Sequence, residues 1–210
     1  MIYKKHKKSK LWLKNNSKDL YIKMVKKDIN KYRSRSWFKL KQIDNKDKIF
    51  KKNITLIDLG SSPGGWSSFA SSKIGHKGKI IAFDLLPMDY IKNVNFYQCN
   101  IYNSIFLDNT LKILNKTKVN MIMSDLSPNI TGIKEIDIPQ IMNLNELVLK
   151  LCYSYLKNHG VLLLKTFYCK EFNKFYNKVN SIFKIVKIRK PNASRSKSSE
   201  IYIVAKGYKN

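Results

Sequence analysis

The chain has 210 residues, 43% of them hydrophobic and 12% aromatic, which excludes a mainly disordered protein and allows a substantial core. Its 41 Lys and Arg residues outnumber 14 Asp and Glu residues, for a formal net charge of +27. This excess favours a polyanionic partner, and a bilayer-spanning helix is not expected because no apolar run approaches the roughly 20 residues required.

The first stretch, residues 1 to about 30, is predicted to form a basic and weakly helical arm. Trp12 and Tyr21 lie among its lysines. Basic residues with scattered aromatic side chains suit a contact with nucleic acid, although a solvated tail fits the composition equally well.

A helix is predicted to begin near Ser36, a suitable capping residue. Trp37, Leu40 and Ile43 then share one apolar face. Lys39 lies away from this face, so its position in the pattern is that of a solvated lysine.

Downstream, strand-like apolar runs alternate with helical stretches. Strands are expected at Thr55–Leu59, Lys79–Leu85, Val94–Cys99, Val119–Asp125, Val161–Phe167, Ile185–Arg189 and Ile201–Lys206. Helices are expected at Gly65–Ser72, Asn103–Asn115, Ile138–Leu156 and Lys170–Ser181. This βαβα order predicts an α/β fold with an open, mainly parallel sheet and helices on both faces. Residues 1–210 are expected to form one domain.

The first strand runs directly into a glycine-rich turn, Gly60-Ser61-Ser62-Pro63-Gly64-Gly65-Trp66. Doubly wound sheets bind ligands beyond the carboxyl ends of such strands, and glycines let the backbone approach a ligand closely. The spacing matches neither a dinucleotide fingerprint nor a P-loop, so a nucleoside fits better than a pyrophosphate. An ordinary strand-to-helix loop is the alternative.

Polar residues follow the next two strands. Asp84 ends the second strand, where an acid hydrogen-bonds ribose hydroxyls in doubly wound sheets or, alternatively, caps the following turn. Asn100 follows the third strand and is placed to meet a base edge, with Leu85 and Met88 as apolar cover. With the glycine turn, these residues predict a slot for a nucleoside.

A second constellation comprises Asp125, Lys165 and Glu200. Asp125 and Lys165 each end an apolar strand, and parallel strands would place both where the slot opens. Glu200 would approach them if the last strand is antiparallel. A lysine in this position is costly without a partner, so the set is either a catalytic centre or a salt bridge between strand ends.

Several separated motifs resemble the FtsJ/RrmJ family of S-adenosylmethionine-dependent RNA ribose 2′-O-methyltransferases. They are Asp58–Trp66, Asp84–Met88, Met123–Asn129, Arg33–Leu40, Asp137–Pro139, Arg189–Pro191 and Glu200–Ala205. The resemblance covers nearly the whole chain. It implies a Rossmann-like class I methyltransferase fold, with a seven-stranded, mainly parallel sheet and an antiparallel last strand.

The resemblance also implies residue roles. It assigns a catalytic tetrad to Lys39, Asp125, Lys165 and Glu200. Contacts to S-adenosylmethionine, with S-adenosylhomocysteine as product, are expected from Asp58, Gly60, Pro63, Gly64, Gly65, Trp66, Asp84, Leu85, Asn100 and Asp125. Family members often carry Asp where this chain has Asn100, so altered cofactor affinity is expected. Lys165 would accept the proton of the ribose hydroxyl as a neutral amine or, as an ammonium, orient that hydroxyl.

The expected substrate is a uridine in large-subunit rRNA, within a large ribosomal subunit or its precursor. The RNA would contact Arg33, Arg35, Arg189, Lys190, Arg195 and Lys197. A tRNA anticodon-loop methyltransferase is the enzymatic alternative, and a non-catalytic RNA-binding ribosome assembly factor is the alternative from another class.

The remaining expectations concern the protein's surroundings. Three widely spaced cysteines favour free thiols in a reducing compartment, which is the cytoplasm of a bacterium or an organelle of a eukaryote. The three histidines have no ligand spacing, so no metal is expected. The protein is expected to be a monomer that does not bind membranes.

Overall fold

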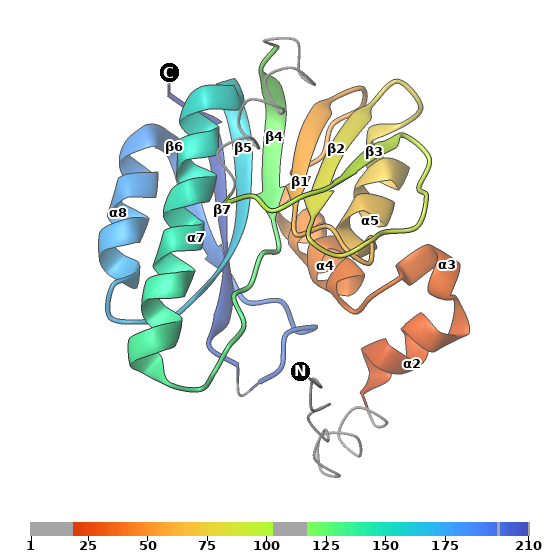
Figure 1. The fold of residues 1–210 in the computed structure, drawn as a ribbon. Helices are drawn as coiled ribbons and strands as arrows, with labels where there is room; N and C mark the ends of the chain where they lie inside the picture. Colours follow the sequence, from red (N-terminus) through yellow and green to blue (C-terminus); the bar gives the residue numbers. More distant parts are fainter. Residues whose placement is uncertain (1–18, 103–116, 197, 210) are drawn as a thin grey trace.

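The computed structural model of the protein describes residues 19–102, 117–196 and 198–209 (Figure 1). Its strands form one seven-stranded sheet in the order β3-β2-β1-β4-β5-β7-β6. The strands are β1 Thr55–Leu59, β2 Lys79–Asp84, β3 Val94–Gln98, β4 Val119–Ser124, β5 Leu156–Phe167, β6 Phe183–Arg189 and β7 Glu200–Tyr208. β1 to β5 pair in parallel, and β7 is antiparallel to both β5 and β6. The prediction of a mainly parallel sheet with an antiparallel last strand is confirmed.

Helices cover both faces of this sheet, as predicted (Figure 1). One layer contains α4 Ser36–Asp47 and α5 Gly65–Ile74, and the opposite layer contains α7 Lys134–Tyr155 and α8 Phe172–Ile182. Successive side chains of a strand point to opposite faces. Leu56 of β1 therefore packs in the α4–α5 layer, whereas Ile57 packs in the α7–α8 layer.

The described part of the N-terminal arm packs on α4. It forms α2 Leu20–Lys27 and α3 Ile29–Tyr32. The ring of Tyr21 lies 5.2 Å from that of Phe38, and Asp19 forms a 2.6 Å salt bridge with Arg35. The arm is therefore part of the folded protein from residue 19, and Trp12 lies outside the described residues.

Element boundaries differ from the predictions where polar side chains reorganise the backbone. Ser36 is the first residue of α4 and not its cap, and its hydroxyl pairs instead with that of Ser34. α7 begins at Lys134, one turn before the predicted Ile138. The carboxylate of Asp137 accepts the backbone N–H groups of the loop before α7, which fixes this earlier start. The helix predicted at Asn103–Asn115 lies outside the described residues.

Two expected absences can be examined over the described residues. Within these ranges no helix combines the length and apolarity needed to cross a bilayer. No cluster of three or more His, Cys, Asp or Glu side chains suited to a metal ion occurs in the same ranges. The three cysteines are free thiols, and burial raises the pKa of Cys152 far above its ordinary value.

Candidate active site

Five ionisable side chains lie on the α4–α5 side of the sheet, near one edge. Each lies two positions along the chain from a strand residue that is buried in this layer. Because alternate side chains of a strand point to the same face, the five side chains point to the α4–α5 side. The parallel arrangement of β1, β2, β4 and β5 brings their carboxyl ends to this edge, and the antiparallel β7 begins there. The five residues are Asp58, Asp84, Asp125, Lys165 and Glu200.

Two lysine–carboxylate pairs form the centre of this site. The Nζ atom of Lys39, from α4, lies 2.7 and 2.9 Å from the carboxylate oxygens of Glu200. The Nζ atom of Lys165 lies 3.4 Å from Oδ1 of Asp125 and donates to its backbone carbonyl at 3.2 Å. All four side chains are only 11–16% exposed, so Lys39 is not the solvated lysine that its place in the helical pattern indicated.

Tyr202 joins the two pairs. Its buried hydroxyl lies 3.1 Å from Oε1 of Glu200 and 3.4 Å from Oδ1 of Asp125. Burial, followed by the charges of these two acids, raises the pKa of Tyr202 well above its ordinary value. The sequence patterns considered above assign no role to Tyr202. It lies two positions after Glu200 on the same strand, and this spacing places both side chains on one face.

The ionisation of Glu200 is also set by its neighbours. Burial opposes the charged form, but the ammonium of Lys39 prevails and holds the pKa of Glu200 below its usual range. Ser194 donates a 2.8 Å hydrogen bond to the same carboxylate. Glu200 therefore carries a negative charge at neutral pH, and Ser194 is a second residue that sequence analysis missed.

The glycine turn is in close contact with other segments of the protein. Gly60 and Gly64 have φ values of 74° and 108°, which other residues adopt only with strain. A Cβ atom on Gly64 would lie 2.9 Å from the side chain of Arg33, and one on Gly65 would lie 2.1 Å from Ser34 Oγ. The turn therefore needs glycine partly because the segment before α4 packs against it.

Two side chains predicted to bind the cofactor, those of Asp58 and Trp66, are buried beside the turn and bonded to neighbouring segments. Asp58 is fully buried, and its carboxylate accepts a 2.6 Å hydrogen bond from Ser67. Burial raises its pKa to about 7. The indole of Trp66 is 2% exposed and donates to the carbonyl of Ser36. Both side chains are buried, so Asp58 would act on a cofactor through the turn that it supports, and Trp66 through its backbone. The cofactor-binding role of both residues stays a prediction.

The residues of the predicted nucleoside slot lie beside this turn, at the ends of β2 and β3. Asp84 accepts the N–H of Ser62 at 2.8 Å, so its carboxylate faces the turn. Leu85 is 62% exposed, and Asn100 is also exposed, with its Oδ1 accepting the N–H of Tyr102. An acid, an exposed apolar side chain and an amide beside a glycine turn are the groups that would suit the ribose, base face and base edge of an adenosine group.

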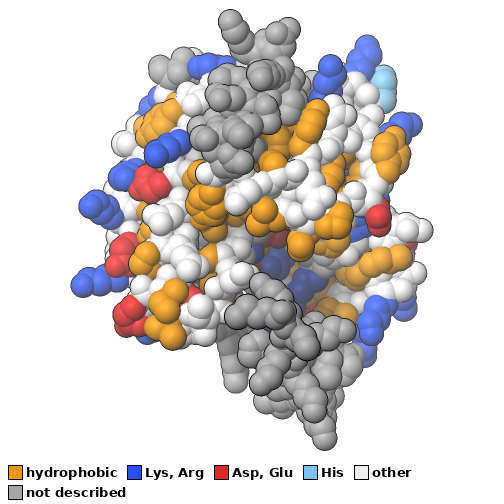
Figure 2. All heavy atoms as spheres, viewed as in Figure 1, with side chains coloured by type: hydrophobic (Ala, Val, Ile, Leu, Met, Phe, Trp, Pro, Cys, Tyr) orange, Lys and Arg blue, Asp and Glu red, His pale blue; other side chains and the backbone are white. Residues whose placement is uncertain are grey.

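The cationic residues predicted to bind RNA are largely engaged within the protein. Arg33 donates to three backbone carbonyls, Arg35 to the carbonyl of Ala193, and Lys190 to those of Ser196 and Ser198, while Arg189 forms a two-pronged salt bridge with Asp47. Arg195 is exposed and Lys197 lies outside the described residues. On the face in Figure 2, Lys and Arg side chains lie mostly around the outline of the molecule, and apolar side chains gather across its middle.

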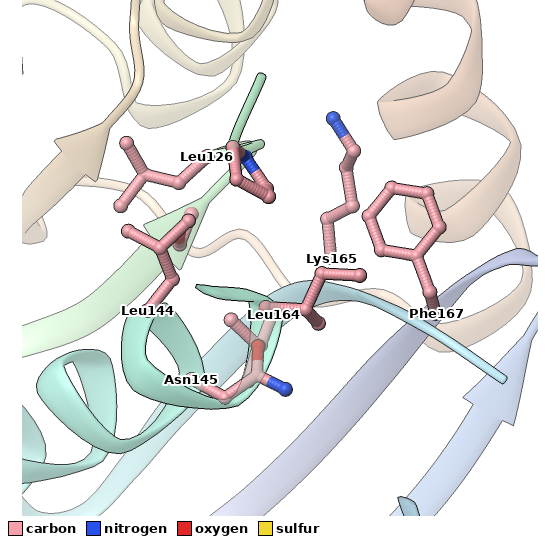
Figure 3. Close-up of a pocket in the computed structure, with 9 residues that line it drawn as sticks. Leu126, Leu144, Asn145, Leu164, Lys165 and Phe167 are labelled. Carbon is pink, nitrogen blue, oxygen red and sulfur yellow. The ribbon is translucent and has the colours of Figure 1, made fainter. Parts of the chain in front are cut away.

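Two hollows adjoin the lysine–carboxylate pairs. A cleft of about 220 Å³ is lined by Arg35, Lys39, Arg195, Ser198 and Glu200. A much smaller pocket of about 10 Å³ lies behind Lys165, between the end of β4 and α7. Figure 3 shows the Lys165 amine directed away from Leu144 and Asn145, which line the far side of that pocket. The wider cleft therefore opens where Lys39 and Glu200 meet.

Comparison with known proteins identifies the family of the chain. A family model described as FtsJ-like methyltransferase matches residues 32–208. The chain is 49% identical over 209 residues to the ribosomal RNA large subunit methyltransferase E of Buchnera aphidicola subsp. Cinara cedri, covering 100% of this chain and 99% of that protein. The protein of the same name from Buchnera aphidicola subsp. Schizaphis graminum is 45% identical, over 96% and 97% of the two chains.

Among solved structures, a ribosomal RNA methyltransferase from Plasmodium falciparum superposes with a TM-score of 0.75 at 29% identity, covering 84% of this chain and 98% of that one. An rRNA methylase from Clostridium thermocellum, at 16% identity and a TM-score of 0.57, shares the fold. The extent of the family match and the identity to the bacterial relatives show that the chain belongs to the FtsJ-like methyltransferase family.

Proposed function

We propose that this protein transfers a methyl group from S-adenosylmethionine to a ribose 2′-hydroxyl of large-subunit rRNA, at a uridine. The observation that carries this proposal is the pairing of Lys39 with Glu200 and of Lys165 with Asp125 beside the glycine turn. FtsJ-like methyltransferases use S-adenosylmethionine, and the bacterial relatives named above are large-subunit rRNA methyltransferases.

The cofactor would lie along the slot between the glycine turn and the end of β2. The backbone of Gly60, Pro63, Gly64 and Gly65 would face its methionine part, and Asp84 its ribose hydroxyls. Leu85 and Asn100 would cover and meet the adenine, and Asp125 would lie at the reacting end. When bound, S-adenosylmethionine supplies a methyl group on a positively charged sulfur, and S-adenosylhomocysteine is the product.

The tetrad would prepare the ribose hydroxyl for transfer. A ribose 2′-hydroxyl is a weak nucleophile, so the enzyme must align it with the methyl group and relieve it of its proton. Lys165 would accept that proton as a neutral amine or, as an ammonium, orient the hydroxyl and stabilise negative charge on its oxygen. Lys39 would be held in place by Glu200 at the mouth of the 220 Å³ cleft through which the ribose would enter.

The natural substrate is proposed to be rRNA within a large ribosomal subunit or its precursor. The protein would act as a monomeric single domain, with RNA shape supplying the selectivity that a separate recognition domain would otherwise give. Cytoplasmic action in a bacterium is favoured because the most similar relatives named here are bacterial.

Transfer of a tritiated methyl group from S-adenosylmethionine tests this function. The substrates are large ribosomal subunits, free rRNA and tRNA, followed by nuclease digestion to identify the modified nucleoside. We expect 2′-O-methyluridine in rRNA. Methylation confined to tRNA would instead support an anticodon-loop enzyme, and RNA binding without transfer would support a non-catalytic assembly factor.

The same assay tests Lys165. Replacement by Ala should abolish transfer, and Lys165→Arg should also fail because a planar guanidinium does not replace a compact ammonium. S-adenosylhomocysteine binding by both variants should remain near that of the wild type. Near-normal turnover in Lys165→Ala would rule out the proposed role.

A further inference from the structure

The guanidinium of Arg33 joins two loops that are separate in the sequence. Its Nη1 donates to the carbonyl of Asp89 at 2.9 Å and lies 3.4 Å from that of Pro63, and its Nη2 donates to the carbonyl of Tyr90 at 2.7 Å. Pro63 belongs to the glycine turn, whereas Asp89 and Tyr90 belong to the loop that follows Asp84. These are the two loops between which the proposed cofactor slot lies.

The backbone of Arg33 is held in an unfavourable conformation. Its φ and ψ angles are 54° and −39°, and the N–H of Ser34 donates to the carbonyl of Tyr32 across it, which makes a γ-turn with positive φ. This turn is rare and strained for a residue with a Cβ atom. Strain of this kind persists only where surrounding contacts impose it, and here the Arg33 side chain also lies against Gly64.

Two arginines separated by one residue, Arg33 and Arg35, contact different partners. Arg33 reaches the cofactor loops, whereas Arg35 reaches the carbonyl of Ala193 and the carboxylate of Asp19. The residue that follows Arg35 is held against the glycine turn, because the indole of Trp66 donates to the carbonyl of Ser36. Arg33 thus lies on the cofactor side of the segment that leads into the Lys39 helix.

We propose that Arg33 is a positioning residue for S-adenosylmethionine, setting the spacing of the two loops that hold it, and not primarily a phosphate contact. This rests on the proposed function, which places the cofactor between these loops. Ser62 links the same loops through its N–H to Asp84 and its hydroxyl to the carbonyl of Pro87. Arg33 links the two loops at Pro63, Asp89 and Tyr90. Its planar guanidinium directs several N–H groups at these carbonyls, and the single ammonium of a lysine cannot reach all of them.

Arg33→Lys separates the two roles because it keeps the positive charge and removes the fork. We measure the Kd for S-adenosylhomocysteine by calorimetry, the KM for S-adenosylmethionine and for rRNA, and the melting temperature, all on the full chain. Cofactor affinity should fall about tenfold or more, as expected for the loss of charge-assisted hydrogen bonds that join the two loops. The KM for rRNA should stay within about twofold, since the charge that a phosphate contact needs is retained.

Lys31→Ala is the matched control. Lys31 is exposed on the same segment, with its ammonium over the ring of Tyr32, so this variant removes a nearby charge and should leave cofactor affinity unchanged. Arg33→Gln, which retains a hydrogen-bond donor without the charge, serves if Arg33→Lys melts below the assay temperature.

Two results would overturn the assignment of Arg33. One is wild-type binding of S-adenosylhomocysteine by Arg33→Lys, and the other is an equal loss of cofactor and rRNA affinity in that variant. A wild-type protein that bound no S-adenosylhomocysteine would contradict the proposed cofactor site itself, and that outcome is distinct from the other two.

Discussion

The hydroxyl of Tyr202 lies where the two lysine–carboxylate pairs meet. It can donate to only one acid at a time, and it lies within hydrogen-bonding distance of both Glu200 and Asp125. Without it, each carboxylate would lose a buried partner and the pairs could shift independently. Alignment in a methyl transfer is sensitive to small displacements of the groups that hold the nucleophile.

Replacement of Tyr202 by Phe should therefore lower kcat with little effect on cofactor binding. Loss of one buried hydrogen bond between catalytic groups predicts a decrease of about tenfold. Steady-state kinetics with saturating rRNA give kcat and the KM for S-adenosylmethionine. Tyr208→Phe, a buried tyrosine at the other end of β7, is the control and should keep the wild-type kcat. An unchanged kcat in Tyr202→Phe would mean that the hydroxyl does not align the acids.

Asp58 predicts a specific dependence of stability on pH. Its pKa in the folded protein, about 7, lies above its ordinary value of 3.8. The folded state therefore binds this proton more tightly than the unfolded state, and the contribution of Asp58 to the free energy of unfolding falls as pH rises from about 4 to about 7. Asp58→Asn keeps an acceptor for Ser67 and removes the titration.

Urea unfolding across this pH range measures the effect. The stability of Asp58→Asn relative to the wild type should increase with pH by an amount on the order of a few kcal/mol. Acids with lowered pKa values, such as Glu200, make the folded protein less stable at low pH. They are present in both proteins, so the difference in stability between the two reports on Asp58 alone. Parallel stability curves for the two proteins would show that the Asp58 carboxyl is not perturbed.

At the scale of single residues, the sequence predicted the strand-end groups better than their partners. Asp125 and Lys165 were recognisable because a charge follows an apolar run, and strand parity places both on one face. Lys39 was recognised only through family resemblance, because its helical pattern indicated solvent. The carbonyl contacts of Arg33 had no sequence signal, since backbone acceptors from distant loops leave no mark on residue type.

At the scale of elements, the glycine turn and the segment before α4 act as one unit. Gly64 has positive φ, and a Cβ atom on it would collide with the side chains of Arg33 and Ile91. Gly132 also has positive φ, but no atom lies within 4 Å of where its Cβ would be. Both positions therefore favour glycine because of their positive φ, but only at Gly64 would an added side chain also collide with neighbouring residues.

Gly64→Ala and Gly132→Ala form a matched pair of variants. Both should lose about 1–2 kcal/mol of stability from backbone strain. Only Gly64→Ala should also weaken S-adenosylhomocysteine binding, because its new methyl group would displace Arg33 from the cofactor loops. Calorimetry on both variants measures this difference. Equal affinity in the two would show that the packing of Arg33 on the turn does not shape the slot.

The order of strands and helices followed from periodicity and turn residues, whereas some boundaries depended on tertiary contacts. α7 starts a turn early because Asp137 holds Thr131 and Gly132. β5 extends back to Leu156 because Val119 of β4 pairs with it across an irregular register. These boundaries depend on contacts with residues outside the helix or strand, which the hydrophobic pattern of the element itself does not reveal.

At the scale of the whole molecule, the net charge of +27 predicts electrostatic binding of RNA. Phosphate neutralisation releases counterions, so affinity should fall by about 10³-fold or more between about 50 and 200 mM salt. Filter binding of an rRNA fragment at increasing salt measures the slope. A flat response would show that the charge reflects lysine-rich composition without phosphate contacts.

The most direct test of the proposed function is mapping of 2′-O-methyl groups in large-subunit rRNA from cells that carry only the Lys165→Ala protein. Resistance of the rRNA backbone to alkaline cleavage identifies each modified ribose. We predict loss of one 2′-O-methyluridine that wild-type cells contain, with tRNA methylation unchanged. An unaltered rRNA pattern in these cells, or a loss confined to tRNA, would contradict the proposal.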